Sequence, residues 1–502
     1  MIRKLLVNTS SNVSVMVVKI LITFVLTPVI VHNLGKYDYG LWEMLAAVLG
    51  YMGLLDLGLK PALSRFAAKY KAEEDRESLL QVYSSGLFFM GAIGILLCCI
   101  FVMWALFLPD TVAKEDGSVS HYAALLVIIG VQLVFKFPGF VAESFLEGFQ
   151  KYYLKNNLTI VLSLIGAVII YSFINQQNGL VLLAFVSSLS LSIKYVLFGI
   201  LLAMRSSGGL IPDWRCFNLH TLGGLMGFGF KSFIQGISAR VQDATDSLII
   251  GLILGPATVP FYSIPANLVR YLRTLGQLLT HAFMPFFSEL SAKSEKEKLL
   301  QFYLRGNKYI LGLIIPLAAG ICIVGGPFIG VWIGPEFREK GELIIFLLII
   351  FSVTPMLNPF GNRYLTAIGK HGIFAKFAPI AAVGNLGLSL ALILPLGVEG
   401  VALASAIPVL IITPIYLKYA CNQLGIKLSR YVRASILPSF LPTLLMFMAV
   451  GAVRLSWGLN SYAMIGAAIC LGACIYFPMF WFLALRSNER VFIMRRIPGL
   501  SA

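Results

Sequence analysis

The sequence predicts an all-α integral membrane protein, and two observations carry this prediction. Of the 502 residues, 58% are hydrophobic and only 12% are charged, whereas a soluble chain carries roughly 25% charged residues. The apolar residues also gather in windows of about 20, which is the length of a membrane-crossing helix. A chain of this composition lacks the polar surface that a water-soluble body of its size requires.

Fourteen windows, each ended by Gly, Pro, Asn or a charged residue, qualify as crossings. The first six are 10–32, 40–64, 79–108, 121–146, 156–174 and 180–204. The other eight are 222–254, 258–290, 299–333, 342–367, 373–394, 399–422, 433–454 and 461–485. The predicted organisation is therefore an N-terminal lobe (1–204), a linker (205–220), a C-terminal lobe (221–422), two further helices (432–486) and a basic tail (487–502).

The basic residues predict how the chain is oriented. If the N-terminus is cytoplasmic, the cytoplasmic segments carry 23 Lys and Arg residues and the opposite loops carry five. Cytoplasmic loops of membrane proteins are enriched in Lys and Arg, so we expect both termini in the cytoplasm. This asymmetry also accounts for the net charge of +16. Nucleic-acid binding is disfavoured, because no basic run is interleaved with aromatic residues for base stacking.

An internal repeat divides the crossings into two sets of six. Residues 79–86 (LLQVYSSG) recur as residues 299–306 (LLQFYLRG), with five of eight positions identical. At the same offset, near 220, Leu34-Gly35 falls on Leu254-Gly255. Parallel repeats of transporters pack around an axis along the membrane normal, with the binding site between them. The repeat predicts two six-helix lobes followed by two additional helices.

Several charged residues lie within the predicted crossings, where a central Lys or Arg costs about 2.5–3.5 kcal/mol. Lys60, Lys194, Arg305 and Lys308 lie near span ends, where a long side chain can reach the interface. The remaining charges suggest a bundle around a polar cavity. In the eighth window, five polar residues recur at spacings of three and four, with Arg273 at the margin of the same helical face. They are Asn267, Arg270, Thr274, Gln277 and His281.

A second polar face is predicted on the preceding helix. It includes Lys231, Gln235 and Gln242, with Arg240 opposite. A cavity lined by Lys and Arg attracts anions, and Arg can hold a phosphate through two parallel hydrogen bonds. We therefore predict a cationic substrate cavity formed by the following residues: Lys19, Lys231, Gln235, Arg240, Gln242, Asn267, Arg270, Arg273, Thr274, Gln277, His281 and Arg363.

The acidic residues within the crossings allow two interpretations. Asp243 and Asp246 are candidates for coupling to Na⁺ or H⁺, because intramembrane acids often serve this purpose in transporters. Asp56 and Lys60 have helical ion-pair spacing and are predicted to form a structural pair. The sequence contains no phosphate-loop, zinc or hydrolase motif. We expect no bound cofactor or metal and no enzymatic activity, and energy from an ion or substrate gradient.

The opening crossings also resemble a known family. The resemblance rests on Leu34-Gly35, Tyr39-Gly40-Leu41-Trp42, Asp56-Leu57-Gly58-Leu59, Ala62 and Arg65, followed by a charged loop. This pattern is similar to the start of bacterial oligosaccharide flippases. These are the O-antigen and polysaccharide transporters of the multidrug/oligosaccharidyl-lipid/polysaccharide exporter superfamily. The length, the fourteen crossings and the doubled halves extend the likeness to the whole chain.

The resemblance implies a function and a location. The protein would move an oligosaccharide on a polyprenyl pyrophosphate from the cytoplasmic to the outer leaflet of the bacterial inner membrane, through a V-shaped, two-lobed cavity. Its basic residues would meet the pyrophosphate or acidic sugars. Membrane lipids, a polysaccharide polymerase and other glycan-assembly proteins are the partners that this function implies.

Three alternative functions remain open from the residues. A lipid II flippase of the same superfamily fits less well with the N-terminal motif. A cation-coupled drug or metabolite exporter should favour acidic residues in its lumen, whereas the deep charges here are mainly basic. A membrane-embedded sugar polymerase or ligase would require a sizeable outer loop.

Overall fold

A computed structural model describes residues 2–107, 119–204, 209–281, 283, 287, 289–290, 293, 295–370 and 372–494. Within these ranges every regular element is helical, which confirms the predicted all-α fold. Contacts between Cα atoms divide the chain into two units, Met1–Arg240 and Val241–Ala502.

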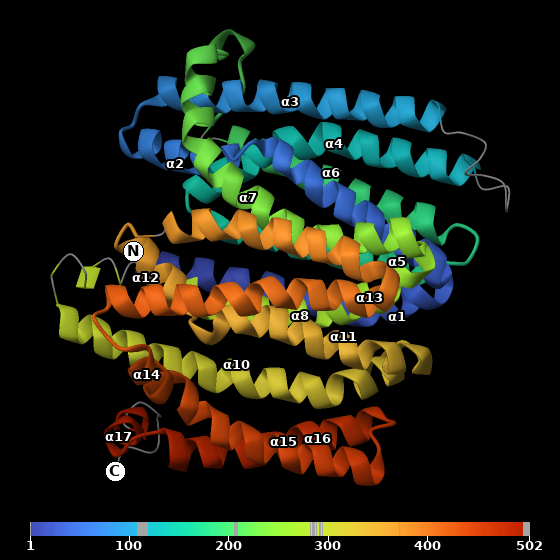
Figure 1. Ribbon diagram of the computed structural model, residues 1–502. Helices are drawn as coiled ribbons and strands as arrows, with labels where there is room; N and C mark the ends of the chain where they lie inside the picture. Colours follow the sequence, from blue (N-terminus) through green and yellow to red (C-terminus); the bar gives the residue numbers. More distant parts are fainter. Residues whose placement is uncertain are drawn as a thin grey trace. The chain divides into compact units, whose positions relative to one another are not determined.

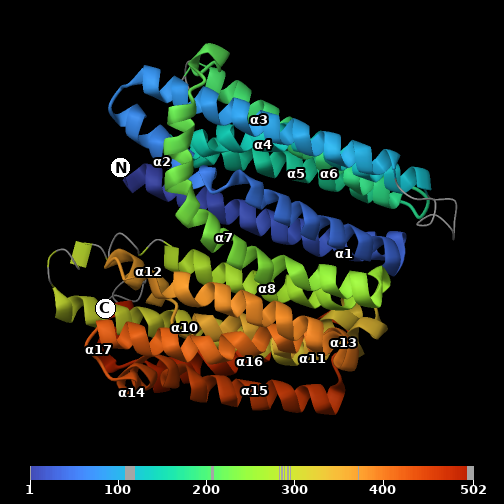
Figure 2. The same ribbon diagram turned by 45° about the horizontal axis from the view of Figure 1, so that its top comes forward.

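In the described residues of the first unit there are six helices and the first part of a seventh, which Figure 1 shows. Figures 1 and 2 both show α3 and α4 side by side, and these two helices share an extensive contact. The elements are α1 (Ile2–Met52), the 3₁₀ turn η1 (Gly53–Asp56), α2 (Leu59–Ala72), α3 (Arg76–Leu106), α4 (Val119–Gly148), α5 (Tyr152–Phe173), α6 (Gly179–Ala203), η4 (Trp214–Cys216) and the start of α7 (Leu219–Leu254).

The second unit begins within α7 and ends with a short helix (Figure 2). In it, α15 and α16 lie side by side and both contact α10. Its elements are η5 (Pro256–Thr258), α8 (Val259–His281), α10 (Lys296–Trp332), α11 (Pro335–Val353), η6 (Thr354–Leu357), α12 (Gly361–Ala367), α13 (Gly372–Gln423), α14 (Leu428–Tyr431), the π-helical turn η7 (Val432–Ile436), α15 (Leu437–Trp457), α16 (Tyr462–Met479), the π-helical turn η8 (Phe480–Ala484) and α17 (Ser487–Met494).

The structure supports a multi-pass membrane protein. Among the described residues, ten helical segments are long and apolar enough to cross a membrane. Two of them contain a glycine with non-helical torsion angles, Gly35 in α1 (φ 73°, ψ 176°) and Gly397 in α13 (φ 61°, ψ −139°). Each of these segments is therefore two helices joined at a kink, as the predicted breaks at 32–40 and 394–399 require. α7 and α8 are helical but more polar, so the count of fourteen crossings stays a prediction.

The predicted second crossing, 40–64, is not one continuous helix. The chain leaves α1 through η1, and then Leu57 (φ 53°, ψ 26°) and Gly58 (φ 73°, ψ 13°) adopt the left-handed conformation before α2 begins. The Asp56 carboxylate stabilises this break, because its Oδ1 accepts a hydrogen bond of 2.8 Å from the Gly58 N–H.

A close backbone contact attaches the first part of α7 to this break. A Cβ atom on Gly58 would lie 2.2 Å from the carbonyl oxygen of Gly229, and a Cβ on Gly229 would lie 2.7 Å from that of Gly58. Only glycine permits such an approach at both positions. The division between the units consequently falls within α7, at Arg240 and Val241, rather than in the predicted linker at 205–220.

The repeated segments occupy corresponding environments in the two units. Tyr83 of α3 is buried, with its ring centroid 4.9 Å from that of Phe145 in α4. Tyr303 of α10 is also buried, and its ring lies 5.5 Å from that of Tyr364 in α12. In both copies the shared tyrosine fills the core between one long helix and the next crossing, which supports the predicted doubling of the fold.

The last two long helices belong to the second unit by packing. A buried apolar cluster joins Ile323 and Val324 of α10 to residues of α15 and α16, including Val450 and Ile465. Tyr476 of α16 donates a hydrogen bond of 2.5 Å to the Gly312 carbonyl of α10. α15 and α16 are thus anchored on α10.

Candidate functional site

Three of the predicted substrate residues line one cavity in the second unit. Arg273 and Gln277 of α8 and Arg363 of α12 face a cavity of about 190 Å³. Asn358 and Asn362 line the same space, and none of the described residues that line it is acidic. The cavity therefore offers two guanidinium groups, which suit an anion, and amides that can hydrogen-bond to hydroxyl groups.

The packing of α8 explains why these side chains face the cavity. Val269, Leu272 and Gly276 are on the buried side of the helix. A Cβ on Gly276 would lie 2.6 Å from the Met356 methyl carbon, so α8 packs closely against η6. Gly276 and Met356 also line the cavity, so Arg273 and Gln277 face it from beside this contact, and the Arg273 guanidinium lies 5.7 Å from the centroid of the Phe351 ring.

The rest of the predicted α8 stripe has mixed outcomes. Arg270 is exposed and Asn267 and Thr274 are half-buried, but none of the three lines the Arg273 cavity. On α7, Arg240 is exposed and Gln242 is half-buried. The remaining predicted side chains lie outside the described part of the structure: Lys231, Gln235, Asp243 and His281.

The first unit contains a second cationic cavity. Lys19 of α1 and Lys194 of α6 line a space of about 330 Å³ between α1, α5 and α6. Its walls are mostly aliphatic, with hydroxyl groups from Ser163 and Ser190, and they include no acidic residue within the described part of the chain. Lys19 was predicted to face a cavity. Lys194 was expected to extend toward the membrane interface, but the structure shows that Lys194 lines the same cavity as Lys19.

The predicted pair of Asp56 and Lys60 is wrong. The Lys60 Nζ instead lies 3.1 Å from Glu143 Oε1 and 3.6 Å from Glu147 Oε1, both on α4. Lys155 of α5 shares these acids, at 2.7 Å from Glu147 and 3.5 Å from Glu143. The spacing of four residues fits an ion pair only on a continuous helix, and the left-handed residues 57 and 58 interrupt the helix between Asp56 and Lys60.

Asp246 is the centre of a buried polar cluster in the second unit. Its carboxylate is on α7, is 3% exposed, and accepts hydrogen bonds from the Tyr262 hydroxyl of α8 and, at 3.0 Å, from the Ser405 hydroxyl of α13. The Asn385 amide donates a hydrogen bond of 2.9 Å to the Ser405 Oγ. Ser389 is buried on the same helix as Asn385. The cluster thus joins α7 and α8 to both halves of α13.

Oxygen atoms dominate this cluster. Asn385 Oδ1 and Ser389 Oγ are buried and have no hydrogen-bond partner among the described residues. A carboxylate with amide and hydroxyl oxygens is the kind of donor set that hard cations prefer. These surroundings are compatible with the ion coupling predicted for Asp246, and the Asp243 side chain lies outside the described part of the structure.

Some residues of these sites escaped sequence analysis. Glu143 and Glu147 are one helical turn apart at the end of the apolar window 121–146, which is a detectable signal. Asn358, Asn385 and Ser405 carry no such signal, because single amides and hydroxyl groups are common in membrane helices.

Comparison with known proteins identifies the family. Residues 5–291, more than half of the chain, match the family described as polysaccharide biosynthesis protein. The chain belongs to this family. The matched range includes the Leu34–Arg65 pattern and the broken second crossing, so the resemblance seen in the sequence is confirmed.

Relatives of this chain match it over most of its length. The uncharacterized membrane protein EpsK of Bacillus subtilis is 23% identical and covers 82% of this chain and 83% of its own. A putative O-antigen transporter of Shigella flexneri is 24% identical, over 76% of this chain and 89% of its own. The solved structure of the lipid II flippase MurJ in an inward closed conformation superposes with a TM-score of 0.73 at 14% identity. It covers 94% of this chain and 98% of MurJ.

Proposed function

We propose that this protein is a flippase that moves a polyprenyl-pyrophosphate-linked oligosaccharide from the cytoplasmic to the outer leaflet by alternating access. Membership of the polysaccharide biosynthesis family supports a glycan substrate. The relative named as a putative O-antigen transporter supports movement across a membrane. A lipid-linked glycan has an anionic pyrophosphate, many hydroxyl groups and an apolar tail, so its carrier needs cationic and polar surfaces inside membrane helices.

The observation that carries this proposal is the pairing of Arg273 with Arg363 in one cavity. No acidic residue among the described residues lines the cavity that holds these two guanidinium groups. Keeping them in membrane helices is costly, and a pyrophosphate would offset that cost through charge-assisted hydrogen bonds. The cavity of Lys19 and Lys194 offers a second cationic surface in the first unit.

Replacing both arginines with glutamine tests the proposal. Purified protein is reconstituted into vesicles with a fluorescent lipid-linked oligosaccharide, and a membrane-impermeant glycosidase reports transfer between leaflets. We expect the Arg273→Gln/Arg363→Gln variant to lose most of its transfer activity. The matched control, Arg215→Gln/Lys418→Gln, removes two exposed positive charges outside the cavity and should retain activity.

The same vesicles distinguish the substrate class. Lipid II, offered in place of the lipid-linked oligosaccharide, should be moved slowly or not at all. Normal oligosaccharide transfer by a reconstituted Arg273→Gln/Arg363→Gln variant would refute the cationic-site proposal.

We further propose that transport is coupled to Na⁺ or H⁺ at Asp246. The carboxylate, the Asn385 amide oxygen and the hydroxyl groups of Ser389 and Ser405 would hold Na⁺, or Asp246 would carry the proton. Binding there would bring α7, α8 and both halves of α13 together. Because α7 is shared by both units, a change at Asp246 can influence both.

Asp246→Asn is the matching test, since asparagine keeps the size of the side chain and removes its charge. Initial transfer rates in vesicles are measured with imposed Na⁺ or pH gradients. We expect the wild-type rate to increase with one gradient and the variant rate to be independent of both. An Asp246→Asn protein with the wild-type ion dependence would exclude this residue from coupling.

A further inference from the structure

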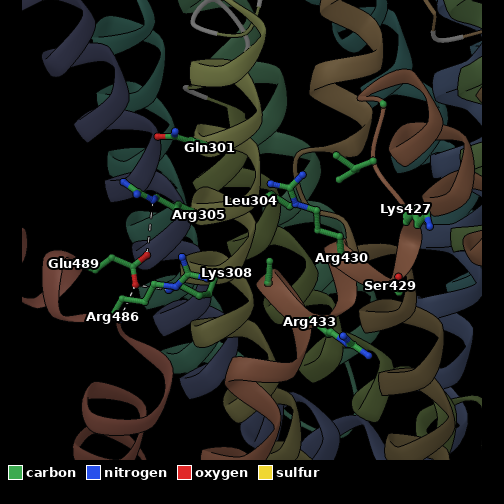
Figure 3. Close-up of a pocket in the computed structure, with 13 residues that line it drawn as sticks. Gln301, Leu304, Arg305, Lys308, Lys427, Ser429, Arg430, Arg433, Arg486 and Glu489 are labelled. Atoms are coloured by element: carbon green, nitrogen blue, oxygen red, sulfur yellow. Dashed lines mark hydrogen bonds and ion pairs between the residues drawn. The ribbon is translucent and has the colours of Figure 1, made fainter.

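The second unit contains a large basic pocket that the proposed substrate cavity does not include. It has a volume of about 740 Å³ and is formed by α10, residues 425–434 and the segment from Arg486 to Glu489 (Figure 3). None of its lining residues lines the Arg273 cavity. The charge distribution predicts that these ends of the helices lie on the cytoplasmic side.

Positive charge in this pocket greatly exceeds negative charge. Glu489 is the one acidic residue among the described residues that line it, and it is already engaged. Figure 3 shows Arg305 and Lys308 directed toward its carboxylate, with Lys308 forming a buried ion pair and the Arg305 Nε at 4.0 Å. The six basic lining residues are Arg305, Lys308, Lys427, Arg430, Arg433 and Arg486.

Four of these basic residues are not neutralised. Lys427, Arg430, Arg433 and Arg486 are exposed, and no described acidic side chain lies within ion-pair distance of them. Like charges held close together repel one another. A ligand with negative charge would remove this repulsion.

The backbone around the pocket is fixed. The Ser435 hydroxyl of the π-helical turn η7 donates a hydrogen bond of 2.9 Å to the Leu304 carbonyl of α10. The Lys308 ammonium donates a hydrogen bond of 3.3 Å to the Ala484 carbonyl of the second π-helical turn, η8. π-helical turns are rare and often occur at functional sites. Here both turns flank the pocket and are attached to α10.

An apolar surface begins where the pocket ends. Immediately after Arg433 and Ala434, one face of α15 carries large apolar side chains that are between 40% and 56% exposed. Their spacing of three and four residues places them on the same side of the helix. They are Leu437, Phe440, Leu441, Leu444 and Phe447. A ligand with an anionic head and apolar chains would match both features.

We propose that this pocket binds the phosphate headgroup of an anionic membrane phospholipid. Guanidinium groups hold phosphates through paired hydrogen bonds. Basic pockets between membrane helices on the cytoplasmic side recognise anionic headgroups. The exposed face of α15 would lie along the acyl chains. The lipid would hold α17 and the two π-helical turns against α10.

Binding is tested on the full chain in nanodiscs, without any transport measurement. Nanodiscs of phosphatidylcholine are doped with increasing phosphatidylglycerol, and the midpoint of thermal stabilisation gives the apparent affinity. Wild-type protein should be stabilised by phosphatidylglycerol. In Arg430→Gln/Arg433→Gln the affinity should fall roughly fivefold for each arginine, or about 25-fold for both. The matched control Lys376→Gln/Lys418→Gln removes two exposed charges outside the pocket and should bind as the wild type does.

Detergent-solubilised protein distinguishes lipid from free anion. Inorganic phosphate or pyrophosphate alone should stabilise the protein far less than a short-chain phosphatidylglycerol does. The proposal is overturned if phosphatidylglycerol has no advantage over phosphatidylcholine, if the control variant loses as much affinity as Arg430→Gln/Arg433→Gln, or if inorganic phosphate reproduces the whole effect.

Discussion

Substituting Gly58 with alanine should separate α7 from the broken second crossing. Two features of the structure act together at this position. Gly58 has a left-handed backbone (φ 73°, ψ 13°), and the new methyl group would lie 2.2 Å from the Gly229 carbonyl oxygen. The obstacle is a backbone atom and not the end of a flexible side chain, so α7 itself must move.

The expected loss of stability has two parts. A non-glycine residue in the left-handed region costs about 1–2 kcal/mol. Forcing an additional carbon atom into a close-packed contact costs about 1–3 kcal/mol. For Gly58→Ala we therefore expect a total loss of about 2–5 kcal/mol.

Two further variants separate these contributions. Gly369 also has a positive φ, of 71°, but a Cβ atom there would meet nothing within 4 Å. Gly369→Ala should therefore lose only the stability that the left-handed backbone costs, about 1–2 kcal/mol. Gly229→Ala tests the close contact from the other side. Its helical position favours alanine by about 1 kcal/mol, which offsets part of the loss from the clash.

The three variants are purified in detergent, heated in steps, and analysed for the remaining monodisperse protein by gel filtration. Gly58→Ala should lose its folded form at the lowest temperature of the three. If Gly58→Ala is as stable as Gly369→Ala, then the close approach of Gly58 and Gly229 does not hold α7 in place, and our account of the unit boundary is wrong.

Three other predictions concern the ion pairs. Glu489→Gln leaves the buried Lys308 without its acid and should lower the free energy of unfolding by about 3–5 kcal/mol. The double variant Glu489→Gln/Lys308→Met should regain most of this loss. Burial tends to raise the pKa of Glu489, but the hydrogen bonds from Lys308 and from the Arg486 N–H outweigh it and hold this pKa below the ordinary 4.5. The stabilisation by Glu489 is therefore complete above pH 4.5 and is lost as the pH falls through the lower pKa of the folded state. The unfolding temperatures of the wild type and Glu489→Gln should consequently become equal at acidic pH. Glu143→Gln/Glu147→Gln leaves Lys60 and Lys155 without acidic partners. It should lower the free energy of unfolding by about 2 kcal/mol, an amount between those of exposed and buried ion pairs. An unchanged unfolding temperature would argue against the shared network.

The sequence by itself determined the features that depend on local pattern. Apolar windows and the glycine breaks at Gly35 and Gly397 give the helices and their ends, because helix formation in an apolar environment is decided largely by composition. The recurrence of residues 79–86 at 299–306 predicts that the six-helix lobe occurs twice. The spacing of Arg273 and Gln277 places them on neighbouring parts of one helix, because the period of the helix is fixed.

Only the tertiary structure decided which of these residues meet. Arg363 of α12 and Arg273 of α8 line one cavity, and Lys194 joins Lys19 because α6 packs beside α1. Ser405 reaches Asp246 across 159 residues of sequence. The helical period specifies the face on which a residue lies, but not which helix lies opposite.

The pair of Asp56 and Lys60 illustrates this limit most clearly. Their spacing is correct for a helix, and two left-handed residues between them remove the helix. Lys60 is then satisfied by acids of α4 that are distant in sequence. The spacing in the sequence predicted Asp56 as the partner of Lys60, and the packing of α2 against α4 decided that its partners are Glu143 and Glu147.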